Sequence, residues 1–202
     1  MTLIRMISGI CAAIALAGCS NSWQVDYANT LTSDVTKNWR LVDVVAVVPE
    51  NLSISESNFI APTADIVWRG EAFGDRRAQV SAIIDEGLTR GASELNGDRP
   101  VTIAARVARF HGVTPAAVAR APSAVHNISY YIQVFDAQTG QALTEQEMIT
   151  ADLEAIVGSA AIAAAINGQT QRVRIVNHLA SVTRGWLGYG PDQRRTFAGI
   201  GR

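Results

Sequence analysis

The spacing of apolar residues predicts four strands. From Trp39 to Pro49 nearly every residue is apolar and five of the eleven are valine, which is typical of a central strand buried on both faces. From Pro100 to Phe110 and from Val125 to Asp136, apolar residues hold alternate positions, as in a strand with one buried face. Ala142 to Leu153 is predicted to be the returning strand of a hairpin, after a turn over Asp136 to Gly140.

Apolar residues spaced three and four apart predict two helices, over residues 75–95 and 171–187. Asp75 is a suitable N-cap for the first helix. Gly87 and Gly91 lie on its apolar stripe, where they would let the helix lie close to a sheet. The elements follow the order strand, helix, strand, strand, strand, helix. We therefore predict an α+β fold, with a small mixed sheet backed by two helices and a right-handed crossover between its first two, parallel strands.

Residues 156–166 carry no charge and are mostly alanine. Eleven residues are too few to cross a bilayer as a helix. The segment can cover the sheet edge, pack against a partner or insert shallowly into a membrane. Covering and packing are favoured, because the segment has neither an aromatic belt nor a basic face.

Two connections between the predicted elements are long, and long loops in compact domains tend to be functional. Residues 50–74 include a predicted short edge strand at 66–68, and the connection at 111–123 reads as a loop rich in proline and alanine. Trp68 and Arg69 form a possible partner contact, since an arginine can stack on a tryptophan and still donate hydrogen bonds. The favoured alternative is that Trp68 closes one end of the core and Arg69 is solvated.

The N-terminus has the layout of a bacterial secretory leader. Residues 1–5 carry one positive charge, residues 6–16 are apolar, and two small residues precede Cys19. Leu16-Ala17-Gly18-Cys19 resembles the lipobox of bacterial lipoproteins, in which the leader is removed before the cysteine and that cysteine is acylated, for instance with palmitate. The resemblance implies lipidation of Cys19, and Ser20 in place of aspartate implies delivery to the outer membrane, on its periplasmic face. The alternative is an ordinary signal peptide cleaved nearby, which would leave a free thiol.

This layout divides the chain into four parts. We expect a lipoprotein signal peptide at 1–18, a lipidated tether at 19–39, a single α/β domain at 40–187 and a flexible tail at 188–202. Val44-Val45, the helical stripe and the Asp136–Gly140 hairpin together resemble the amino-terminal domain of TolB and uncharacterised lipoproteins of the alphaproteobacterial cell envelope. That resemblance implies no site residue apart from the lipobox cysteine.

Composition and motifs restrict the chemistry. Arg5 leaves with the leader, so the formal charge moves from −1 to −2, which gives no attraction to nucleic acid. Cys11 also leaves and Cys19 is the lipid site, so the folded part has no thiol for a disulfide or a metal. The three histidines lack a second histidine or cysteine at ligand spacing, and no nucleophile elbow, zinc-protease motif or phosphate loop is present. We expect no metal, no cofactor and no enzymatic activity.

The leading hypothesis is therefore a non-catalytic, membrane-anchored lipoprotein that binds an envelope protein or serves as an accessory subunit of an envelope assembly. An auxiliary module that binds a small apolar or lipid ligand in a transport system is the alternative. It is favoured by the uncharged residues 156–166 and by the long loop at Trp68. A hydrolase with a dispersed site is a weaker third hypothesis.

Overall fold

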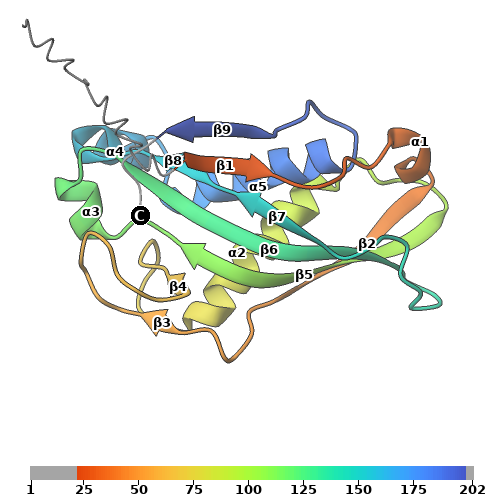
Figure 1. Cartoon of the computed structure of the whole chain (residues 1–202), viewed down its shortest axis with the longest axis horizontal. Coiled ribbons are helices and arrows are strands. Elements are labelled where there is room, and N and C mark those ends of the chain that lie inside the picture. The colour runs from red at the N-terminus through yellow and green to blue at the C-terminus, as the bar shows by residue number, and fades with distance from the viewer. Residues whose placement is uncertain (1–21, 199–202) are drawn as a thin grey trace, which may run out of the picture.

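The computed structural model describes residues 22–198, which form one mixed sheet with helices packed on it (Figure 1). The strands in this part of the chain are β1 (Ser22–Asp26), β2 (Trp39–Val47), β3 (Ile54–Ser55), β4 (Ile66–Val67), β5 (Arg99–His111), β6 (Ala124–Asp136), β7 (Glu147–Ala151), β8 (Leu153–Ala155) and β9 (Arg195–Ala198). The helices within the same residues are α1 (Ser33–Thr36), α2 (Arg76–Gly91), α3 (Pro115–Arg120), α4 (Gly158–Ile166) and α5 (Gln171–Trp186).

The sheet has nine strands in the order β3-β4-β5-β6-β7-β1-β9, with β2 paired to β5 and β8 paired to β6. Strands β2 and β5 are parallel and connected through α2, and β5, β6 and β7 are antiparallel neighbours. The predicted α+β class is confirmed, and the sheet is larger than predicted.

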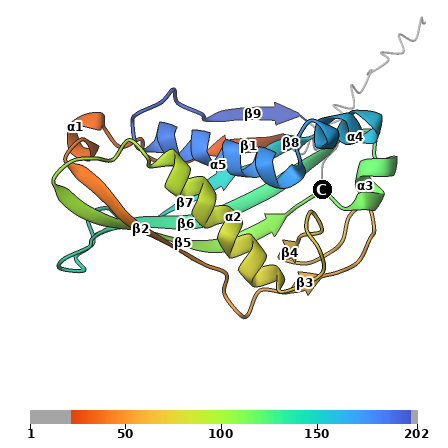
Figure 2. The ribbon, with the colours of Figure 1, turned by 180° about the vertical axis from the view of Figure 1, so that it is seen from behind.

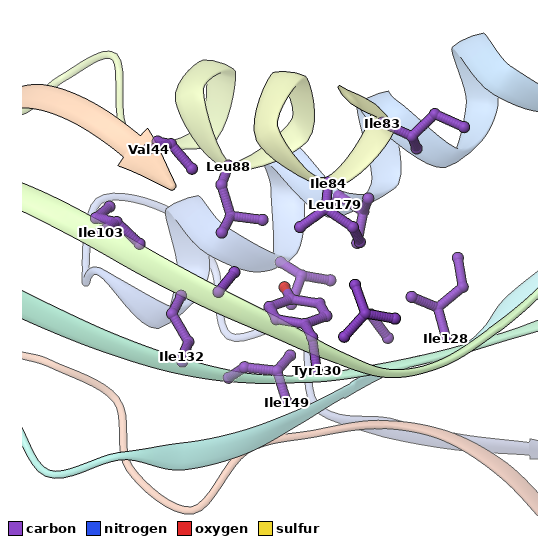
Figure 3. Packing of buried hydrophobic residues seen from close by; sticks show 14 of the residues in the cluster. Val44, Ile83, Ile84, Leu88, Ile103, Ile128, Tyr130, Ile132, Ile149 and Leu179 are labelled. Carbon is purple, nitrogen blue, oxygen red and sulfur yellow. The ribbon is translucent and has the colours of Figure 1, made fainter. Parts of the chain in front are cut away.

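Helices α2 and α5 lie across one face of the sheet (Figure 2). The alternation in β6 turns Ile128, Tyr130 and Ile132 toward these helices, where all three are fully buried. They meet side chains of both helices, among them Leu88 of α2 and Leu179 of α5 (Figure 3). Burial of this shared apolar face is the main force that holds helices and sheet together.

Gly87 and Gly91 serve the contact between the helices. A Cβ atom on Gly87 would lie 2.6 Å from the Cβ atom of Leu179, and one on Gly91 would lie 2.6 Å from the carbonyl oxygen of Ala180. Both distances are too short for a real contact. The expectation that these glycines let α2 approach the sheet was wrong, because they let it approach α5.

Strand β2 is not the central strand that its valines predict. It pairs with β5 on one side, and no described strand pairs with its other side. Val44 and Val48 are buried, whereas Val45 and Val47 are exposed on the opposite phase. The chain reaches β5 through α2 and then continues to β6 on the far side of β5, so β2 stays at the edge.

The predicted lipidated tether and the predicted flexible tail both contribute strands. In the predicted tether, β1 pairs with β7, and in the predicted tail, β9 pairs with β1 from Ser22–Ala198 to Val25–Arg195. Tyr27 joins the two ends, since its buried hydroxyl donates to Asp192 Oδ1 at 2.9 Å. The domain therefore begins at or before Ser22, and residues 188–198 are part of it.

Two further boundaries differ from the prediction. The connection at 111–123 contains α3, and the single strand predicted over 142–153 is divided into β7 and β8. The turn at Asp136 is confirmed: its carboxylate accepts hydrogen bonds from the backbone of Gln138 and Thr139, and Gly140 has φ +72°.

Candidate functional site

Trp68 and Arg69 do not form a surface pair. Trp68 is fully buried, packs edge-on against Phe110 with ring centroids 5.6 Å apart, and donates from Nε1 to Glu71 at 2.8 Å. Arg69 points away to an ion pair with Glu56 at 3.5 Å. Trp68 is therefore a core residue, as the alternative interpretation expected. Cys19 lies outside the described residues.

The face of the sheet opposite α2 and α5 carries a row of large side chains. In the strand registers, Val47 of β2 lies beside Arg106 of β5, Arg106 beside Tyr131 of β6, and Tyr131 beside Met148 of β7. We call these four residues the open-face row. No helix among residues 22–198 lies across this face (Figures 1 and 2). Val47 and Met148 are 48% and 49% exposed, so the row is accessible.

The chemistry of the row suits contact with a protein. The guanidinium of Arg106 lies over the ring of Tyr131, 4.4 Å from its centroid, in a cation–π contact between neighbouring strands. Arg106 has no carboxylate partner among the described residues. Tyrosine, arginine and methionine are enriched at protein interfaces. Sequence reasoning missed the row, because it depends on the registers of four strands.

A second exposed apolar surface lies at one end of the molecule, formed by α3, α4 and the start of α5. We call it the α4 end. None of the nine residues of α4 is buried, and Ile162 and Ile166 are 64% and 80% exposed. A groove of about 490 Å³ runs along it, lined chiefly by Pro115, Val118, Ile156, Ile162, Ile166 and Arg174. The prediction that residues 156–166 cover the sheet edge or pack against a partner stays a prediction, and the structure adds that α4 has no buried residue.

Capping residues position the helices of the α4 end. Thr114 Oγ1 accepts from the backbone of Ala117 at 3.1 Å and donates to the carbonyl of Phe59, which starts α3 and holds the long loop against it. Thr170 caps α5 by accepting from Val173. The side chain of Gln171 then bonds the carbonyl of Val113 at 3.0 Å. The helices around α4 are thus fixed by hydrogen bonds, while α4 itself has no side-chain cap.

Asp152 ties the beginning of the domain to the same end. It is buried, and its carboxylate accepts hydrogen bonds from the backbone of Gln24 in β1 at 3.1 Å and from the side chain of Asn127 in β6 at 2.7 Å. Burial raises the pKa of this carboxyl group above its usual value, against the lowering effect of these donors. Strand β1 begins at Ser22, two residues before Gln24, so Asp152 holds the first strand of the described chain.

The histidines lie apart from the open-face row. His126 in β6 is fully buried with no hydrogen-bond partner on either ring nitrogen, and burial lowers its pKa to about 3. His178 in α5 is also largely buried, which lowers its pKa to about 4. Arg174 adds repulsion to both rings. His111 bonds the carbonyl oxygen of Ala64, so each ring has a structural position in the fold.

No three histidine, cysteine, aspartate or glutamate side chains within residues 22–198 are grouped as ligands of a metal ion. No helix in the same range has the length and apolar character needed to cross a membrane.

Comparison with known proteins identifies a family and gives no activity. The profile of a family described as "Family of unknown function (DUF6778)" matches residues 39–202. A comparison with curated proteins finds no match. Among solved structures, a candidate lipoprotein from Caulobacter crescentus CB15 is 16% identical, with a TM-score of 0.32 over 71% of this chain and 89% of the other. A dodecameric PelC variant from Paraburkholderia phytofirmans is 10% identical, with a TM-score of 0.30 over 79% and 95%. Such TM-scores do not establish a common fold.

Proposed function

We propose that this chain, which belongs to the DUF6778 family of unknown function, is a non-catalytic lipoprotein of the bacterial envelope that binds a protein partner. Cys19 would carry the lipid and hold the domain on the periplasmic face of the outer membrane. We also propose that the chain is related to lipoproteins of the alphaproteobacterial envelope and that its domain is similar to the amino-terminal domain of TolB. Both relationships stay predictions.

The anchor is supported by the leader and the four lipobox residues that end in Cys19. One acyl chain holds a protein only reversibly, whereas two or three hold it firmly. Replacement of Cys19 by serine is expected to release the protein from the membrane fraction. Separation of inner and outer membranes by density then tests the outer-membrane prediction from Ser20, which inner-membrane recovery would contradict.

The open-face row is the observation that carries the partner-binding proposal. Two half-exposed apolar side chains lie here beside a tyrosine and an arginine that has no carboxylate partner among residues 22–198, and tyrosine, arginine and methionine are the residue types enriched at protein interfaces. Arg106 sets the chemistry of the partner: an apolar protein surface with a carboxylate near its centre. That carboxylate would pair with the guanidinium between Val47 and Tyr131.

Site-specific photocrosslinking tests this surface. A benzophenone amino acid at position 131 in the anchored protein is expected to give one adduct with an envelope protein. Arg106→Glu in the same chain should abolish that adduct, because the charge complementarity is reversed. The matched control is the same probe at Val35, an exposed apolar residue of α1. Equal adducts from both positions, adducts that survive Arg106→Glu, or adducts with a second copy alone would contradict the proposal.

The groove of the α4 end favours a second function, binding of a small apolar or lipid ligand. Its volume of about 490 Å³ and its apolar lining are in the range of small-molecule sites. Native mass spectrometry of protein purified from membranes would show a bound lipid that Ala165→Trp, which fills the groove, removes. Ligand-free protein in every preparation would exclude this function and leave the open-face proposal intact.

A further inference from the structure

We infer that α4 lies in the headgroup layer of the membrane that holds the lipidated chain, with Ile162 and Ile166 inserted among the lipids. This inference rests on the proposed anchor at Cys19 and goes further, because it assigns the membrane-facing side of the domain. The first observation is the composition of the segment. Between Glu154 and Arg172 no residue is charged, and α4 presents its isoleucines to the outside.

The second observation is the length of chain between the lipid and the fold. Only Ser20 and Asn21 separate Cys19 from Ser22, the first residue of β1. Three residues span at most about 11 Å when fully extended. An acylated Cys19 would therefore hold the start of β1 at the membrane surface. The earlier expectation of a tether of about 20 residues would have left the domain free to move away.

The third observation places α4 at this same end. Gln24 in β1 and Asp152 exchange two hydrogen bonds, at 3.1 Å each, and the chain continues from Asp152 through β8 into α4 at Gly158. Six residues span at most about 20 Å. Both views show the start of β1 and the end of β9 at the end of the molecule where α4 lies (Figures 1 and 2). The anchor brings this end to the bilayer, and α4 is its apolar part.

The geometry favours shallow insertion over spanning. Nine residues of helix are about 14 Å long, well short of the bilayer core of about 30 Å. A helix lying flat needs only an apolar side and an anchor that keeps it near the surface. The exposed isoleucines provide the apolar side, and the lipid on Cys19 makes up for the missing basic face. The groove beside α4 would then open toward the lipids.

The sequence allows this placement to be measured with a single label. With Cys11 removed in the leader and Cys19 acylated, a cysteine introduced at position 162 is the only free thiol. The full chain with Ile162→Cys carries an environment-sensitive fluorophore and is reconstituted in phosphatidylethanolamine–phosphatidylglycerol vesicles. Some of these lipids carry a doxyl quencher near the headgroup. Val35→Cys is the matched control, because Val35 is apolar, 51% exposed and on α1 at the opposite end.

The expected result is co-flotation of both proteins with the vesicles and quenching at position 162 severalfold stronger than at position 35. Ile166→Cys should give the same result and shows that the effect belongs to the helix. Equal quenching at 162 and 35 in protein that floats would overturn the inference and leave the anchor in place. A blue-shifted label at 162 without quenching would assign α4 to another copy of the chain, and would also overturn it. Failure to float would refute the anchor and the inference together.

Discussion

Helices α4 and α5 follow each other in the chain, separated by four residues, and differ in whether their apolar side chains are buried or exposed. Helix α5 carries three arginines and a histidine, yet it buries seven residues, including Ile175, Leu179 and Trp186. Helix α4 has no charged residue, and none of its nine residues is buried. Hydrophobicity alone therefore does not determine which helix enters the core.

The difference lies in periodicity and neighbours. Apolar residues of α5 fall on one stripe, which α2 and the sheet cover, while Arg172 pairs with Glu71 at 3.1 Å and Arg184 pairs with Glu94. Helix α4 consists mostly of alanine, so it has no broad stripe of large apolar side chains to pack on the sheet. The helix lies at the end of the sheet with none of its residues buried. An exposed helix without charge is costly in water, which is why a lipid surface explains it better than solvent does.

The largest expected effect distinguishes the two helices directly. Leu179→Ala in α5 removes a fully buried side chain and should lower the free energy of unfolding by about 2–5 kcal/mol. Ile162→Ala in α4 should change it by less than about 0.5 kcal/mol. Urea unfolding of both variants in detergent measures these values. A large loss for Ile162→Ala would mean that α4 belongs to the core after all.

The buried histidines predict a loss of stability in acid. Because the folded-state pKa of His126 is about 3, the folded protein binds fewer protons than the unfolded chain below pH 6.5. The contribution of the neutral His126 to the free energy of unfolding is complete above pH 6.5 and decreases as the pH falls toward 3. Between pH 7.5 and 4.5 the loss from His126 should be on the order of 2–3 kcal/mol.

The variant His126→Leu checks this assignment. Its free energy of unfolding at pH 7.5 should equal or exceed that of the natural protein, since two unpaired ring nitrogens leave the core. Its dependence on pH should be weaker, with the part due to His178 retained. Urea titrations from pH 7.5 to 4.5 that give parallel curves for both proteins would show that His126 is not responsible.

A glycine substitution tests how closely α2 and α5 approach. Gly91→Ala places a Cβ atom 2.6 Å from both the carbonyl oxygen of Ala180 and the Cβ atom of Thr183. The expected loss is about 1–3 kcal/mol. Gly74→Ala is the control, because its Cβ atom would lie 3.4 Å from the nearest atom. Thermal unfolding of both variants should separate them, and equal midpoints would contradict the close packing.

The smallest effect on stability is expected on the open face. Met148→Ser should change the free energy of unfolding by less than about 0.5 kcal/mol, because half of the side chain is already in water. The same variant should weaken the partner adduct formed from position 131. Loss of stability without any change in the adduct would mean that Met148 serves the fold and not a partner.

The sequence predicted the parts of the fold where local pattern and tertiary contact agree. Alternation in β6 marked its buried face correctly, and Asp75 caps α2 by accepting from the backbone of Ala78. Thr114 followed by Pro115 is a helix start that could have revealed α3. Strands β1 and β9 were missed, because each has few apolar residues and gains its place from pairing with the other.

The candidate surfaces were less accessible to sequence reasoning. Trp68 was singled out by its type, but Gly70 and Gly112 make room for its ring inside the protein. The open-face row combines residues from four strands whose registers no local pattern contains. The composition of residues 156–166 did draw attention to α4, while its place beside the start of β1 came from the hydrogen bonds between Gln24 and Asp152.

Lipidation of Cys19 can be measured by intact-mass and N-terminal peptide analysis of the protein extracted from membranes. We expect the mature chain to begin at Cys19, with a diacylglyceryl group on the sulfur and an acyl group on the nitrogen of this residue. A mature chain that begins at another residue, or an unmodified Cys19 thiol, would contradict this expectation.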